Sequence, residues 1–316
     1  MTDQGRTCFQ YESGTYGFTS GNRQWIGLVQ NHDATPSMNV IPIRYQGSTD
    51  RNVDDFANGM KEFNGTISYL PQDWKFLGFA IGSIQDLTGS HIFTENNSDN
   101  VTQIGSEPLY HFTIEDSKNL GTPGENFIRT IIGGMVDSYT INYTQGELVS
   151  CDIDYIAQSE TMSSGAVTAL AATTTAPYVF NNAQLQVPSG TLVSNLREGT
   201  FVVNNNLERG NYLNGSRVSH ELLPMNRDYE VTATCVMDEG NARTFYDSYY
   251  IAGSTFNSML KFEAAAGSLC IVMSGCKMTE MTVPSPLEGV QEQTFTFVPS
   301  HCYPVAYDDT TKYNAW

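Results

Sequence analysis

The chain has 316 residues, 40% of them hydrophobic, which is enough to bury a sizeable core in one large domain or two ordinary ones. It is strongly acidic, because 34 Asp and Glu against 16 Lys and Arg give a formal net charge of −18. Proteins that bind nucleic acid neutralise phosphates with Lys and Arg, so this balance argues against DNA as a bound ligand.

The N-terminal residues 1–10 have no apolar core of a signal peptide, and no stretch approaches the length of a membrane helix. We therefore expect a chain that is not bound to a membrane. The cysteines occur singly, without CxxC pairs or a neighbouring His at zinc-ligand spacing. They are predicted to be buried thiols: Cys8, Cys151, Cys235, Cys270, Cys276 and Cys302.

Short alternating runs separated by Gly and turn residues predict a mostly β protein. Helical periodicity is limited to residues 52–63 and 241–253. Residues 84–126 are rich in Asn, Ser and Gly, which predicts a long surface loop inserted between strands. Residues 159–177 are rich in Ser, Ala and Thr, which predicts a linker.

Residues 133–158 predict a β-hairpin with two unlike faces. The odd positions are mostly apolar, from Met135 to Tyr155, whereas the even positions carry hydroxyl, amide and carboxylate groups. Because side chains alternate across a strand, one face of this hairpin should be dry and the other wet and acidic.

The same hairpin pattern recurs later in the chain. Residues 133–158 align without a gap on residues 275–300 at a constant offset of 142, which pairs Gly133 with Gly275 and Tyr155 with Phe297. An identical order of elements in both copies indicates an internal duplication.

Three further landmarks precede the hairpin in both halves. The strand 62–69 corresponds to 228–235, and the end of a short helix at 79–83 corresponds to 250–254. The loop Gly47-Ser48 corresponds to Gly215-Ser216. We therefore divide the chain into a first module, a linker and a second module: 1–158 with an insertion at about 84–126, 159–177, and 178–316.

Known catalytic motifs do not emerge from the sequence. His220 and Glu221 begin an HExxH-like run, but Pro224 stands where the second His is needed. Residues 115–121 resemble a calcium loop except that Lys118 replaces an oxygen ligand. Asp152 and Asp154 share one face of a strand, an arrangement that resembles the paired carboxylates of a glycosidase. We expect no enzyme, cofactor or metal site.

Several segments resemble tail tube proteins, also called major tail proteins, of long-tailed bacteriophages (siphoviruses) and archaeal tailed viruses. The likeness spans about Tyr11 to Val298. It is carried by YESGTYGFTSGNRQWIGLVQ (11–30), IRYQGSTDRN (43–52), FNGTISYLPQDWKFLGFAIGS (63–83), FVVNNNLERGNYLNGSR (201–217), NRDYEVTATCVM (226–237) and FYDSYYIAGS (245–254).

This resemblance implies two tandem β-sandwich-like modules, each with a short helix, that contribute strands to a shared inner barrel around a channel. Rings of three chains in pseudo-sixfold symmetry would stack into a tube through which viral DNA passes during genome ejection. The implied partners are other copies of the chain, a tape-measure protein, a tail terminator and baseplate proteins. The implied location is the virion tail, assembled in host cytoplasm.

If the two hairpins are barrel strands, their polar faces should line the channel. The residues expected to face the lumen are Ser138, Asn142, Asp152, Asp154, Glu280, Glu292, Thr294 and Thr296. An acidic wall would repel phosphate and let DNA slide without binding.

Two other functions remain possible on the sequence. An acidic two-domain β-sandwich could serve as an adhesin or other binding module, with recognition by its long loops. A carbohydrate-active enzyme on a β-sandwich would need an acid and a base in a cleft, for which only Asp152 and Asp154 are candidates.

Overall fold

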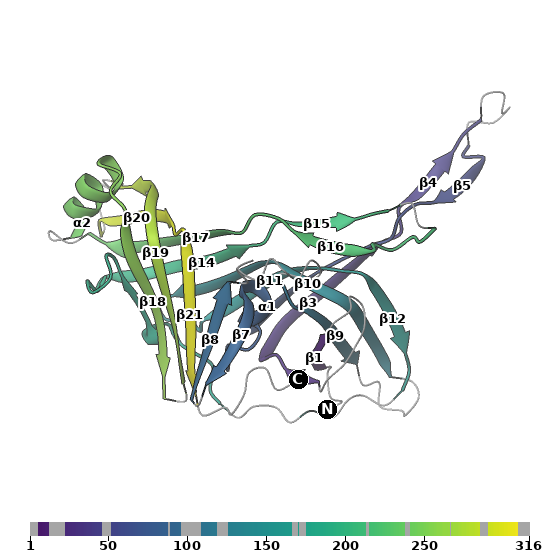
Figure 1. Cartoon of the computed structure of the whole chain (residues 1–316), viewed down its shortest axis with the longest axis horizontal. Helices are drawn as coiled ribbons and strands as arrows, with labels where there is room; N and C mark the ends of the chain where they lie inside the picture. The colour runs from purple at the N-terminus through teal and green to yellow at the C-terminus, as the bar shows by residue number, and fades with distance from the viewer. Residues whose placement is uncertain are drawn as a thin grey trace, which may run out of the picture.

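Antiparallel strands make up most of the protein, as the alternating sequence predicts (Figure 1). The computed structural model describes residues 6–12, 23–45, 52–87, 89–95, 109–118, 126–165, 170, 175–212, 215–237, 241–265, 267–284 and 290–308. Within these residues, none of the helices is long and apolar enough to cross a membrane.

Eight strands form one sheet through the middle of the molecule, which we call the central sheet. The strands β3 and β19 are its two edges, and the described strands do not close it into a barrel. In spatial order they are β3 (Leu28–Ser37), β6 (Glu62–Leu70), β11 (Ser150–Ala157), β10 (Phe127–Thr144), β14 (Leu196–Asn204), β17 (Asp228–Val236), β20 (Glu292–Val298) and β19 (Gly267–Thr282).

The long strands β10 and β19 each leave the central sheet and continue into a flanking sheet. The first flanking sheet combines the start of β10 with β2 (Gln24–Trp25), β1 (Arg6–Glu12), β9 (His111–Lys118) and β12 (Ser159–Ser163). The second combines the start of β19 with β13 (Ala183–Gln186), β18 (Phe256–Ala264), β21 (His301–Asp308), β8 (Ser90–Glu95) and β7 (Gly82–Leu87).

Two hairpins extend from the central sheet, and we call them arms. The first arm, residues 38–60, contains β4 (Val40–Ile43) and β5 (Asp55–Asn58) and follows β3. The second arm, residues 205–227, contains β15 (Leu207–Gly210) and β16 (Glu221–Pro224) and follows β14. The short helical elements are α1 (Leu77–Ile81), η2 (Phe180–Asn182), α2 (Asn241–Thr244) and the π-helical turn η3 (Phe245–Ile251).

One continuous hydrophobic core joins both halves of the chain. It lies between the apolar face of the central sheet and the two flanking sheets, and all five residues of α1 are buried in it. Trp74 shows how the halves interlock, because its ring lies 5.0 Å from that of Tyr178 and 5.4 Å from that of Phe262. Contacts of this kind bury aromatic surface that would otherwise face water.

The strand pairs of the two halves have matching registers. Tyr139 of β10 pairs with Ile153, and Met281 of β19 pairs with Phe295, which are the positions 142 residues further on. The bulge between Val136 and Ser138 has its counterpart between Met278 and Glu280. The bulge between Val29 and Asn31 of β3 likewise matches the one between Leu196 and Glu198 of β14. Because a bulge depends on local register, bulges at corresponding positions show that the backbones of the two halves are alike where their sequences correspond.

The predicted helix at 52–63 is wrong, whereas the one at 241–253 is confirmed by α2 and η3. Residues 55–58 form β5, and Glu62 begins β6. The apolar spacing in this segment suits a helix, but pairing with β4 and β3 supplies its backbone hydrogen bonds. Gly47 and Ser48 lie outside the described residues.

The long loop predicted at 84–126 also needs correction. Its described parts include β8 and β9: β9 pairs with β1 and β10, and β8 crosses to pair with β21 of the second half. The predicted linker 159–177 begins with β12, whose five residues pair with β10. In these segments pairing with strands distant in sequence outweighs a polar, loop-like composition.

The cysteines are free thiols, as predicted. Five are buried and Cys270 is half-buried. Burial raises the pKa of the Cys8 and Cys151 thiols to about 12 and that of Cys276 to about 11. These thiols therefore stay protonated and unreactive near neutral pH.

Gly65 offers a test of how tightly the central sheet packs. It pairs with Tyr155, whose ring covers it and whose hydroxyl lies 2.8 Å from His32 Nε2, and an added Cβ would collide with that hydroxyl. We expect Gly65→Ala to lower the free energy of unfolding by about 1–3 kcal/mol, measured by urea denaturation. Gly165→Ala is the matched control, because its Cβ would meet nothing within 4 Å. Equal stability of the two variants would contradict this account.

Candidate functional site

The two faces of the central sheet differ as the hairpin pattern predicts. Tyr139, Ile141 and Ile153 on β10 and β11 are at most 1% exposed, and Phe295 and Phe297 on β20, the counterparts of Ile153 and Tyr155, are fully buried. This apolar face contacts the core.

The opposite face, which we call the polar face, is formed by the even-numbered residues of seven strands and the odd-numbered residues of β3. All eight residues predicted to face a lumen lie on it. Asp152, Asp154 and Glu280 are exposed, and the other five are half-buried: Ser138, Asn142, Glu292, Thr294 and Thr296.

Hydrogen bonds run across the strands of this face. Ser138 Oγ donates to Asp154 Oδ2 over 2.7 Å, and Asn142 Nδ2 donates to Asp152 Oδ2 over 2.6 Å. Ser68 Oγ of β6 donates to the other oxygen of Asp152 over 2.5 Å. Cross-strand pairs of this kind hold the side chains in a fixed pattern.

The second half of the polar face is held by hydroxyl pairs. The Thr232 and Thr296 side-chain oxygens lie 3.0 Å apart, as do those of Thr234 and Thr294. Glu292, at one end of this face, forms an ion pair with Arg197, whose Nη1 lies 3.1 Å from Glu292 Oε1. The two halves therefore present the same kind of hydrogen-bonded, exposed surface.

Further carboxylates, which were not predicted, extend the acidic surface to strands outside the two hairpins. The alternation in strands β3, β6, β14 and β17 could have identified them, since partners in an antiparallel pair share a face. They are Asp33, Glu62, Glu198, Asp228 and Glu230. Among the described residues that strand pairing places on this face between its bulges, none is Lys or Arg. Arg197, which forms the ion pair with Glu292, lies in the bulge between Leu196 and Glu198.

The geometry does not support the roles of acid and base in a glycosidase for Asp152 and Asp154. Each carboxylate receives a hydrogen bond from a neighbouring strand on an open surface, rather than facing its partner across a cleft. Within the described part of the chain, no group of three or more His, Cys, Asp or Glu could hold a metal ion.

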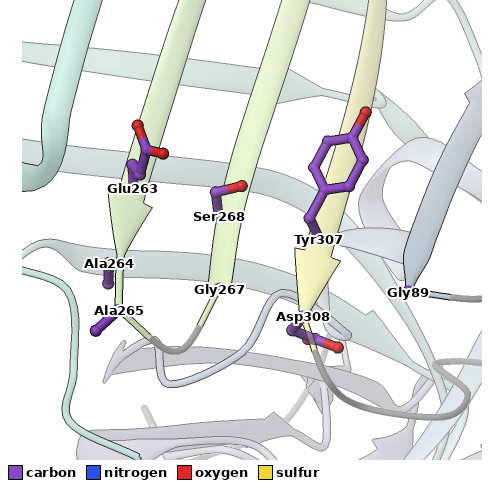
Figure 2. A pocket seen from close by; sticks show the side chains of 8 residues that line it. All are labelled: Gly89, Glu263, Ala264, Ala265, Gly267, Ser268, Tyr307 and Asp308. Carbon is purple, nitrogen blue, oxygen red and sulfur yellow. The ribbon is translucent and has the colours of Figure 1, made fainter.

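A hollow lies at the ends of β18, β19 and β21, lined by Glu263, Ser268, Tyr307 and Asp308 among others (Figure 2). Glu263 pairs with Lys261 Nζ over 2.6 Å, and Asp308 lies 3.2 Å from His91 Nε2. Figure 2 shows the two carboxylates on separate strands, pointing in different directions. They do not converge on a common point where a substrate would react.

The comparisons with known proteins identify the family. The model of the phage tail tube protein family matches residues 47–299, most of the chain, so this protein belongs to the phage tail tube family. The comparison with curated proteins yields no match. Membership makes the chain a structural component of the virion tail that assembles with itself into a tube, and it indicates a non-enzymatic protein.

Neighbouring residues on the two faces should respond differently to truncation. Asp152 is exposed, so we expect Asp152→Ala to change the free energy of unfolding by no more than about 1 kcal/mol. Ile153 is 1% exposed, so Ile153→Ala should cost about 2–5 kcal/mol. Urea unfolding of both variants measures the difference, and a larger loss for Asp152→Ala would show that its carboxylate stabilises the fold.

Proposed function

We propose that the protein forms rings that stack into the tail tube, with the polar face of the central sheet lining a negatively charged channel for viral DNA. The observation that carries this proposal is the central sheet itself: eight strands with one buried apolar face, one exposed acidic face and two unclosed edges. A sheet of this kind leaves backbone donors and acceptors unpaired at its edges, which favours pairing with another copy.

The chain is proposed to be a tandem duplication. Matching registers and matching bulges in β10 and β19, and in β3 and β14, support this. Each module then supplies four strands to the central sheet: β3, β6, β11 and β10 from the first, and β14, β17, β20 and β19 from the second.

The duplication predicts how neighbouring copies join. Within the chain, β10 pairs with β14, and Thr140 lies opposite Val202. The equivalent strands at the sheet edges are β19 and β3, so β19 of one copy should pair with β3 of the next, and Thr282 should lie opposite Thr35. Three copies joined in this way would close a barrel with pseudo-sixfold symmetry.

Stacking of such rings along their axis gives an open filament, because a heterologous contact repeats without closing. The acidic wall would keep DNA from adhering during passage, since like charges repel over a distance of about 10 Å at moderate ionic strength.

The tape-measure protein, the tail terminator and the baseplate proteins are the proposed partners inside and at the ends of the tube. Assembly would occur in the host cytoplasm.

Electron microscopy of the purified protein over a range of concentrations tests assembly. We expect stacked rings or hollow tubes whose symmetry can be counted. Particles that stay monomeric at every concentration would instead favour an acidic β-sandwich binding module.

Disulfide formation tests the register of the ring contact. In a mixture of Thr35→Cys and Thr282→Cys chains, we expect an intermolecular disulfide because directly opposed Cβ atoms lie about 4.5–5.5 Å apart. Ala34→Cys mixed with Thr282→Cys is the control, since residue 34 faces the other side of the strand. The native cysteines should not compete, because they are mostly buried. Equal yields for the two mixtures would contradict the register.

Charge reversal tests the channel wall. Replacing Asp152 and Asp154 by Lys should leave tubes intact, because both side chains are exposed, but slow genome passage through attraction to phosphate. The measurement is DNA release from virions carrying the double variant, with the double Asn variant as a control for loss of charge. Normal release by the Lys variant would count against a lumenal position.

A further inference from the structure

The two arms have the same construction. Asn39 and Asn206 begin them in the left-handed conformation, with φ of 45° and 47°. Asn39 Nδ2 donates to the Met60 carbonyl over 2.9 Å, and Asn206 Nδ2 donates to that of Asn226 over 2.8 Å. Pairing of β4 with β5 also has the register of β15 with β16, so Val40 corresponds to Leu207 and Phe56 to Leu222.

The second arm is docked on the first half of the chain. The backbone amides of Asn205 and Leu207 donate to the carbonyl and to the side chain of Asp137, each over 2.8 Å. Arg209 Nη2 donates to the Phe63 carbonyl over 2.9 Å. Leu222 is 4% exposed and forms a buried cluster with Leu109 and Met135.

Leu207 and Ile156 pack against this cluster, which completes an apolar contact between the arm and the start of the hairpin. Docking therefore combines two backbone hydrogen bonds with burial of leucine side chains.

The first arm is held to its own chain at its base, where Arg217 of the second arm donates to the carbonyls of Gly59 over 2.9 Å and Met38 over 3.4 Å, but its apolar side chains stay exposed. Phe56 is 62% exposed and Val40 is 52% exposed, and among the described residues none from 38–60 belongs to a buried hydrophobic cluster. Figure 1 shows β4 and β5 projecting away from the body, whereas β15 and β16 lie along it. Apolar side chains held out on a two-stranded hairpin mark a contact surface.

The second half carries the matching surface, also exposed. The repeat places Thr279 where the first half has Asp137, Lys277 where it has Met135, and Val298 where it has Ile156. Thr279 has a hydroxyl that can accept a backbone hydrogen bond, as the Asp137 carboxylate does. Val298 is 36% exposed, and the side chain of Lys277 offers a long apolar stem.

We propose that the first arm docks on the second half of a neighbouring copy, in the position that the second arm occupies on the first half of its own chain. The arm cannot reach the same surface of its own chain in this way, because it follows β3 and the surface lies beside β19, at the opposite edge of the central sheet. This inference rests on the proposed ring, in which β3 of one copy lies beside β19 of the next and brings the arm to that surface.

The proposed contact between copies should depend more on apolar burial than the contact of the second arm with its own chain does. Pro42 occupies the position of Arg209, so the arginine's hydrogen bonds to backbone carbonyls have no counterpart. Phe56 replaces the smaller Leu222 and exposes more apolar surface for burial.

Disulfide trapping tests the docking geometry. Val40→Cys chains mixed with Thr279→Cys chains should form an intermolecular disulfide in assembled protein. Leu207→Cys with Asp137→Cys in one chain is the positive control, because these residues already share a 2.8 Å hydrogen bond. Val40→Cys mixed with Glu292→Cys is the negative control, since Glu292 lies at the opposite end of β20 from Val298. A yield for Val40 with Thr279 no higher than this control would overturn the proposal.

The pair Thr35→Cys with Thr282→Cys, at the edges of the central sheet, distinguishes failure of the arm contact from failure of the ring. If Thr35→Cys with Thr282→Cys is trapped and Val40→Cys with Thr279→Cys is not, the ring stands and the arm docks elsewhere. If neither pair is trapped and no tubes form, the ring and the arm contact both fail. Trapping of both pairs supports the two together.

Substitution of Phe56 measures how much the contact matters. Phe56→Asp should raise the protein concentration needed for half-maximal assembly by at least about tenfold, because it places a charge in a buried contact. Phe56→Leu introduces the side chain found at the equivalent position 222 and should assemble nearly normally. An unchanged circular dichroism spectrum of the unassembled protein shows that the fold is intact, and normal assembly by Phe56→Asp would contradict the proposal.

Discussion

The pairing of β10 with β14 is the interaction on which the rest of the structure depends. It runs from Ser138 opposite Asn204 to Thr144 opposite Glu198 and makes one sheet from strands of both halves. Because paired residues share a face, this contact turns the polar sides of both halves in one direction and their apolar sides into one core. It also leaves β3 and β19 as the only edges of the central sheet among the described strands.

The separation of a charged face from an apolar face explains why a tube protein can be acidic without being unstable. Repulsion among the carboxylates is confined to the exposed face, where water and cross-strand partners such as Ser68 and Asn142 solvate them. Cohesion comes from the other face, whose buried tyrosines and phenylalanines pack against α1 and the flanking sheets. Self-assembly through paired edges would add backbone hydrogen bonds without using the charged surface.

The two arms have the same strand register but different surroundings. Leu222 and Arg209 fix the second arm within its own chain, and Phe56 and Pro42 occupy the corresponding positions of the first arm. The proposed docking of the first arm on a neighbour would repeat the internal contact between copies. A ring built in this way would alternate contacts made during folding with contacts made during assembly.

Local alternation in the sequence determined the two faces of the strands described within 133–158 and 275–300, because side-chain direction along a strand follows from its period of two. All eight predicted polar-face residues therefore lie together, from Ser138 to Thr296. Only the tertiary structure decided that 55–58 is a strand, that β8 pairs with β21, and that Leu222 is buried while Phe56 is exposed. The strand 55–58 depends on its pairing with β4, whereas the pairing of β8 and the burial of Leu222 against Leu109 and Met135 depend on partners far away in the sequence.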